Sequence, residues 1–235
     1  MRRLLLVLAL SAAPAYAQHG HAEHAVAAGA DAAMHSHAPS AHLRLSPARA
    51  ATRADTVRAR ALLDTLRRAL APYADTASAV RDGYRMFAPD LKAQRVFHFT
   101  KRGHAVRNAF GFDAARPTSL LYERGPDGRL VLAGAMYTAP RRASVADLDA
   151  RVPLGMARWH LHTNVCVPTP RDGASARERW RETRNGRMLF GPAGDVTTEA
   201  DCDAVGGRFH GEVLNWMVHV DPFDSTLSGA FRADH

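Results

Sequence analysis

Two histidines in the stretch RWHLHTNVC, residues 158–166, have the spacing of metal ligands on a β-strand. Alternate residues of a strand project from one face about 6.5–7 Å apart. His160 and His162 could therefore turn their imidazoles toward one ion at about 2.0–2.1 Å each. Imidazole binds copper, zinc, iron and nickel, and the spacing does not choose among them. We predict a transition-metal site here, with copper or zinc as the expected ion.

A third ligand would have to come from a neighbouring strand. His98 in VFHFT and His219 in WMVHV are the candidates, because each lies in an aromatic, strand-like segment. Met217 and Met156 carry soft sulfur that would favour copper, although either could simply pack. Around the ligands, acceptors that orient the imidazoles would complete the site. Two residues are expected in that role, Asn164 and Asp221.

The same pattern also fits a wet sheet surface. H-x-H occurs by chance in histidine-rich chains, and an antiparallel sheet normally has one polar face. The alternative to a metal site is therefore a metal-free, disulfide-stapled binding or envelope-interaction module. In favour of a metal site, the strand of residues 212–220 divides in the same way as that of His160, with Asn215, Met217, His219 and Asp221 on one side.

Other catalytic chemistries lack their motifs. The chain contains no G-x-S-x-G, H-E-x-x-H, P-loop or G-x-G-x-x-G after a strand, and no C-x-x-C-H for covalent haem. A nucleophilic pair of Cys166 with His162 competes with disulfide formation. No acid or base stands out, so the sequence leaves open whether the protein is an enzyme, and its catalytic residues remain unknown.

The start of the chain has the pattern of a signal peptide. Residues 1–17 combine two arginines, a short apolar run and an A-x-A site, which predicts export to the periplasm or the extracellular space. Residues 18–50 form an alanine- and histidine-rich segment with few large apolar residues, for which we expect disorder. Its histidines either bind loose metal ions or belong to a solvated spacer. They are His19, His21, His24, His35, His37 and His42.

Export also makes the cysteines interpretable. Cys166 and Cys202 are the only two, and an oxidising compartment favours a disulfide between them. Thiolate metal ligation or free thiols are the alternatives.

The charge of +8 could indicate nucleic acid or an anionic surface. The arginines are scattered, however, with no long basic run and no interleaved aromatics, so we expect no nucleic-acid partner. No segment reaches the about 20 apolar residues of a membrane span. Protein partners are not indicated.

The remaining residues, 51–235, fit a single domain. Apolar residues at helical spacing predict helices at 52–71 and 76–87. After Pro89 the pattern changes to strands at 95–100 and 156–167, a hairpin across 118–140 with a Pro-Asp-Gly turn, and a last strand at 212–220. Short helices are expected at 143–152 and 197–207. The fold class is α+β: two N-terminal helices, then a mainly antiparallel sheet or partly open barrel with one disulfide.

Three of these segments carry a resemblance. FDAARPTSLLY (Phe112 through Tyr122), LVLAGAMYTAP (Leu130 through Pro140) and RWHLHTNVC resemble a family of exported bacterial proteins with no established activity. The resemblance covers roughly residues 80–220, and the loop at 168–195 departs from it. It implies that His98 and the strand of His160 and His162 belong to one site.

Overall fold

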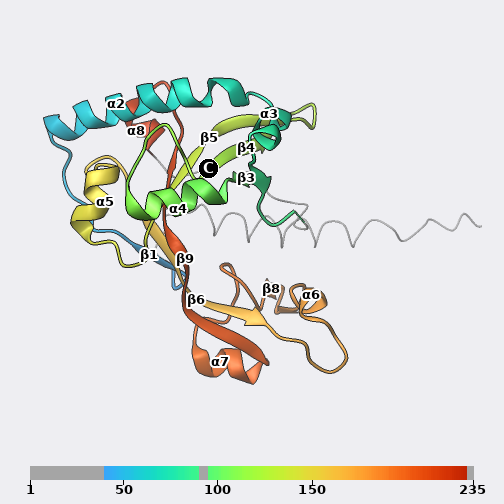
Figure 1. The fold of residues 1–235 in the computed structure, drawn as a ribbon. Helices are drawn as coiled ribbons and strands as arrows, with labels where there is room; N and C mark the ends of the chain where they lie inside the picture. Colours follow the sequence, from blue (N-terminus) through green and yellow to red (C-terminus); the bar gives the residue numbers. More distant parts are fainter. Residues whose placement is uncertain (1–39, 90–94, 232–235) are drawn as a thin grey trace, which may run out of the picture.

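An antiparallel sheet with helices gathered mainly at one end makes up the molecule (Figure 1). The computed structural model describes residues 40–89 and 95–231. Within those ranges it has seven α-helices, one seven-stranded sheet and one two-stranded hairpin. This arrangement confirms the α+β class and the mainly antiparallel sheet. The predicted signal peptide at 1–17 lies outside the described residues.

The large sheet has the strand order β1-β6-β9-β5-β4-β3-β2, and every pairing in it is antiparallel. Its two ends are β1 and β2, so the sheet is open. A separate hairpin, β7–β8, turns at Asn185 and Gly186, which both have positive φ. The strands are β1 Leu43–Leu45, β2 Arg85–Met86, β3 Val96–Thr100, β4 Ser119–Arg124, β5 Leu130–Ala139, β6 His160–Pro168, β7 Thr183–Arg184, β8 Arg187–Met188 and β9 Gly207–Val220.

The longest helix, α2, starts where its sequence signals place it. Thr52 caps its N-terminus in a capping box with Asp55, and its leucine stripe is buried against the sheet. Pro72 follows in a short 3-10 turn, η1 Ala71–Tyr73. The helices are α2 Arg53–Leu70, α3 Thr76–Arg81, α4 Arg102–Phe110, α5 Val145–Arg151, α6 Ala176–Arg179, α7 Glu199–Ala204 and α8 Leu227–Ala230.

The predicted order of two helices before all strands is not what the structure shows. Strand β1 precedes α2 and pairs with β6. The second helix is also shorter than 76–87, because Gly83 adopts a φ of +90° and the chain then enters β2. Helix α4 follows β3 in a stretch where the periodicity indicated no helix.

The segment expected to be disordered, residues 18–50, includes residues that form a strand in the structure. Residues 18–39 lie outside the described residues, but residues 40–50 do not, and Leu43–Leu45 form β1. His42 is buried, with Nε2 2.7 Å from the carbonyl oxygen of Gly194. Ser46 adds contacts with Trp159 through backbone and side chain. A short polar segment is ordered here because a strand edge and a buried ring supply its hydrogen-bond partners.

The two faces of the sheet differ in what they bury. One face carries the main apolar core beneath the helices, with Trp159, Tyr122 and Tyr137 among its fully buried side chains. The other face carries a small apolar cluster of Val96, Leu121, Met136 and Met217. The second face also carries the candidate ligands.

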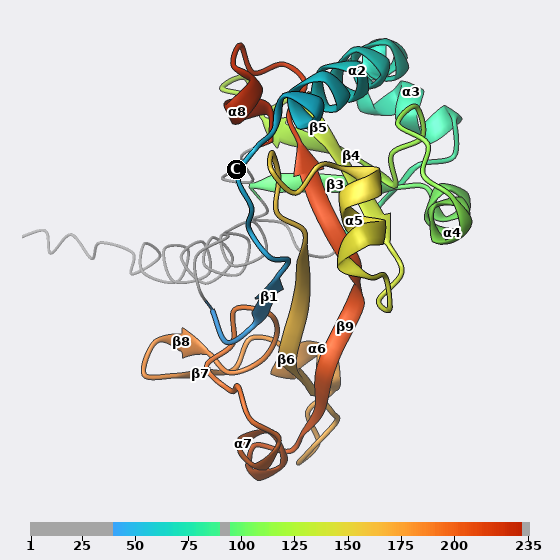
Figure 2. The same ribbon diagram turned by 90° about the vertical axis from the view of Figure 1, so that its left-hand side faces the viewer.

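Away from the end of the sheet where α2 lies, β6 and β9 continue as a two-stranded ribbon (Figures 1 and 2). At its far end lie α6, α7 and the β7–β8 hairpin. The predicted disulfide is confirmed there: Cys166 on β6 bonds Cys202 on α7, with an S–S distance of 1.98 Å. The disulfide packs with Phe190 and Val196 in a separate small core.

In residues 40–89 and 95–231, none of the helices has both the length and the apolar character that a membrane crossing needs.

Candidate metal centre

Four histidines from three strands lie together inside the protein. His98 belongs to β3, His160 and His162 belong to β6, and His219 belongs to β9. All four are buried, with exposed fractions of 5%, 1%, 2% and 2% respectively. His160 and His162 therefore do not lie on a wet sheet surface.

The rings form a continuous chain of contacts. The ring centroids of His98 and His219 are 5.6 Å apart, and those of His219 and His160 are 5.2 Å apart. The rings of His160 and His162 are 5.6 Å apart. The structure thus brings together all four predicted ligands, with His219 and His160 in the middle of the chain.

Strand register explains the central pair. His160 on β6 lies opposite Met217 on β9, and His219 is two residues further along β9. Residues two apart on a strand share a face, so His160 and His219 are diagonal neighbours across adjacent strands. Long side chains can meet across such a diagonal.

His98 joins the pair only because the sheet curls. Two strands, β4 and β5, separate β3 from β9, which in a flat sheet would place their axes about 14 Å apart. Rings on a flat sheet could not approach to 5.6 Å, so this face is concave. A β-bulge supplies bending, since Leu121 faces Gly134 while Tyr122 faces Leu132, which leaves an extra residue on β5. Gly134 allows close strand approach, because a Cβ there would lie 2.6 Å from the carbonyl oxygen of Val220.

A second irregularity lies beside His162. The pairing of β6 with β9 shifts between His160, opposite Met217, and His162, opposite Val213. The extra residues of β9 include Leu214, whose φ is +62°. Asn215 is exposed in this shifted segment. Asn215 was expected on one face with Met217 and His219, and its exposure shows that it takes no part in the buried cluster.

The spacing of the rings suits a shared ion. A metal–nitrogen bond of about 2.0–2.1 Å places the ion about 3.2 Å from a ring centroid. Two ligands at a tetrahedral angle then have centroids about 5.2 Å apart, and at about 120° they are about 5.5 Å apart. The three observed separations, 5.2 to 5.6 Å, lie at or just above these values, so each pair of neighbouring rings has the spacing of two ligands to one ion. As the side chains stand, however, no three His, Cys, Asp or Glu residues in the described part of the chain form a group that could hold a metal ion.

The residues predicted to orient the imidazoles have other hydrogen-bond partners. The side-chain amide of Asn164 donates to the carbonyl oxygen of Ala41 at 2.7 Å, and Asn164 has a φ of +53°. The Asp221 carboxylate accepts from the backbone N–H groups of Phe223 and Asp224 and so stabilises the turn after β9. Asn164 thus joins β6 to the segment before β1, and Asp221 stabilises a local turn; the strand pattern alone revealed neither contact.

Two further histidines have structural contacts that the sequence did not indicate. In addition to its Gly194 contact, His42 places Nδ1 3.3 Å from the carbonyl oxygen of Thr163. His104, expected as a surface residue, is half-buried, with Nδ1 3.0 Å from the carbonyl oxygen of Pro117. Burial lowers the pKa of His104, and this outweighs the contact with Pro117.

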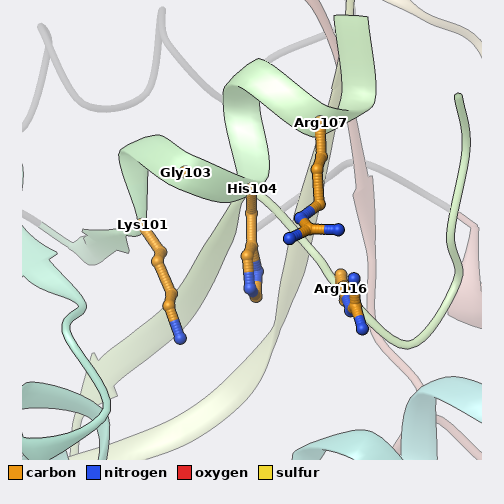
Figure 3. Close-up of a pocket in the computed structure, with 5 residues that line it drawn as sticks. All are labelled: Lys101, Gly103, His104, Arg107 and Arg116. Carbon is orange, nitrogen blue, oxygen red and sulfur yellow. The ribbon is translucent and has the colours of Figure 1, made fainter. Parts of the chain in front are cut away.

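His104 also lines an open pocket of about 440 Å³ at α4, separate from the histidine cluster (Figure 3). Its other lining residues are Lys101, Gly103, Arg107 and Arg116. The pocket is cationic, but Lys101 is paired with Asp82 at 2.9 Å and Arg116 with Asp113 at 3.3 Å. These acidic partners reduce the attraction that the pocket offers to an anion.

Comparison with known proteins adds no assignment. No protein-family model matches the chain, and neither a curated protein nor a solved structure matches it significantly. The functional argument therefore depends on the residues themselves.

Proposed function

We propose that this chain is an exported protein that binds one copper or zinc ion through its buried histidine cluster. The observation that carries the proposal is the unbroken series of ring contacts from His98 through His219 and His160 to His162. Four buried imidazoles on one concave, largely apolar face exceed what packing needs, since histidine is only intermediate among residue types in how often it is buried and aliphatic side chains fill cores more often. Neutral imidazole nitrogens are good ligands for both ions.

Export rests on two observations. Residues 1–17 have the pattern of a signal peptide, and the cysteines form a disulfide, as favoured in oxidising compartments. A periplasmic or extracellular protein with a dedicated site could sequester or transfer its ion. A metal-dependent reaction is the alternative use of the site, with an open coordination position for substrate.

A metal-free binding module is the second candidate. Met136 and Met217 pack with Val96 and Leu121 on the face that carries the histidines. That packing is what a purely structural role for His219 would require. The same apolar contacts would also surround a bound ion, so metal content separates the two candidates.

The test compares metal retention by the full chain and by variants. Wild-type protein is loaded with Cu(II) or Zn(II), dialysed against a competing chelator, and analysed by mass spectrometry for metal per chain. We expect one retained equivalent in wild type and its loss in His160→Gln/His162→Gln. The control is His104→Gln/His210→Gln, which also removes two imidazoles but leaves the cluster intact. His210 lies further along the β6–β9 ribbon, opposite Val165.

The full chain is needed because a chain shortened to begin at residue 50 would lose β1 and the Ser46 contacts. Histidines in residues 18–39 are common to all variants, so differences between variants report on the cluster. Bound metal should also raise the unfolding temperature of wild type and of the control, since an ion that binds only the folded state stabilises it. Equal metal retention by wild type and His160→Gln/His162→Gln would refute the proposal.

A further inference from the structure

The histidine face also carries two buried thioethers. Met217 lies directly opposite His160 in the β6–β9 register, and Met136 lies directly opposite His219 in the β5–β9 register. Their exposed fractions are 6% and 7%. Each methionine therefore neighbours one of the two central imidazoles.

Met217 has the more central position. Directly opposed residues of an antiparallel pair have Cβ atoms about 4.5–5.5 Å apart, which sets the distance from Met217 to His160. His219 follows Met217 by two residues on the same strand and face. Met217 thus borders both His160 and His219, whose ring centroids, 5.2 Å apart, are closer together than those of the other two pairs in the chain of contacts. Its flexible side chain allows the sulfur to turn toward an ion held between them.

We infer that Met217 is a thioether ligand and that the ion held with His160 and His219 is Cu(I). This inference rests on the proposed function and adds the identity and oxidation state of the ion. Thioether sulfur is a soft ligand that favours Cu(I), whereas Zn(II) is well served by imidazole nitrogen. From the sequence, Met217 could be either a metal ligand or a packing residue. The strand register places it beside His160 and His219.

The surroundings favour the same ion. Val96 and Leu121 make this face apolar, and two imidazoles and a thioether form a neutral ligand set. The penalty for moving an ion out of water grows with the square of its charge, so a monovalent ion is buried at far lower cost than a divalent one. Met156, the other methionine that the sequence raised, packs against the main core beneath the helices instead.

The test measures Cu(I) and Zn(II) affinities in the full chain with Met217→Leu. Cu(I) is supplied without oxygen as a bicinchoninate complex with ascorbate, a reductant chosen to preserve the disulfide. Met217→Leu conserves side-chain volume and should lower Cu(I) affinity about tenfold or more while changing Zn(II) affinity only slightly. Met156→Leu, the matched control, should change neither. X-ray absorption at the copper edge should show a sulfur neighbour in wild type that is absent from Met217→Leu.

The outcomes separate this inference from the proposed function. If Cu(I) binding depends on His160 and His162 but is unchanged in Met217→Leu, Met217 only packs and the inference is wrong while the metal site stands. If wild type and His160→Gln/His162→Gln retain the same amount of ion, the proposed function fails and the inference fails with it. Selective loss of Cu(I) affinity in Met217→Leu supports both.

Discussion

Removal of the Cys166–Cys202 disulfide should separate stability from metal binding. The bond joins residues 36 positions apart in the sequence. In the chain-entropy model a loop of that length gives about 4 kcal/mol of stabilisation at 25 °C. That is a large share of the about 5–15 kcal/mol that typically separates folded from unfolded protein. The double variant Cys166→Ala/Cys202→Ala should therefore lose about 4 kcal/mol of unfolding free energy.

The structure also indicates where this loss acts. The disulfide packs with Phe190 and Val196 at the far end of the β6–β9 ribbon. Along β6, Cys166 lies four residues beyond His162, about 13 Å away at the rise of a strand. The double variant should therefore keep the metal bound by the wild type, provided that it is folded under the conditions of measurement.

Urea unfolding followed by circular dichroism measures the loss of unfolding free energy. The slope of that free energy against urea concentration is fitted separately for wild type and variant. Metal retention after dialysis measures the second, below the urea midpoint of the variant. A loss under about 1 kcal/mol would refute the loop-entropy reasoning. Loss of metal from a folded variant would refute the separation of the two regions.

Three other changes test the packing and the electrostatics. Gly134→Ala should destabilise the protein by about 1–3 kcal/mol in urea unfolding, because the new Cβ would lie 2.6 Å from the Val220 carbonyl oxygen. Gly211→Ala is the control, since a Cβ at Gly211 would have no atom within 4 Å. Equal losses of stability in the two variants would contradict the argument. His104→Gln should flatten the pH dependence of stability between about pH 5 and 7. Burial lowers the pKa of His104, so acid favours the unfolded state in wild type, and an unchanged slope would exclude this role. Asp55→Asn should destabilise at pH 7, because hydrogen bonds from Arg49 hold the pKa of Asp55 well below its usual range. The deficit should shrink between about pH 4 and 2, as wild type loses the same contribution, and a pH-independent deficit would contradict the ion-pair argument.

Local signals were enough to predict many of the elements. The capping box at Thr52 and the leucine stripe behind it specify α2, since both depend on residues within a few positions of one another. The hairpin of β4 and β5 follows from two strand-like runs around a turn. Gly83 ended α3 earlier than expected, because its positive φ outweighed the helical pattern beyond it.

Contacts between distant segments escaped prediction. Strand β1 and the buried His42 belong to a polar, alanine-rich stretch whose composition predicts disorder. Their order depends on β6 and on Gly194, more than 100 residues away, and composition carries no information about such partners. The contact of Asn164 with Ala41 escaped prediction for the same reason, since Ala41 is also more than 100 residues away.

For the candidate site, the sequence by itself determined the residue types and the faces on which they lie. A period of two puts His160 with His162, and Met217 with His219, as long as the alternation is unbroken between the two residues of each pair. Only the tertiary structure decided that His98 meets His219, because that contact needs β4 and β5 to curl between them. The curl comes from a bulge and from close strand packing at Gly134, both of which depend on pairing between strands. Alternation fixes the direction of a side chain, whereas sheet curvature fixes the distance between strands that are not neighbours.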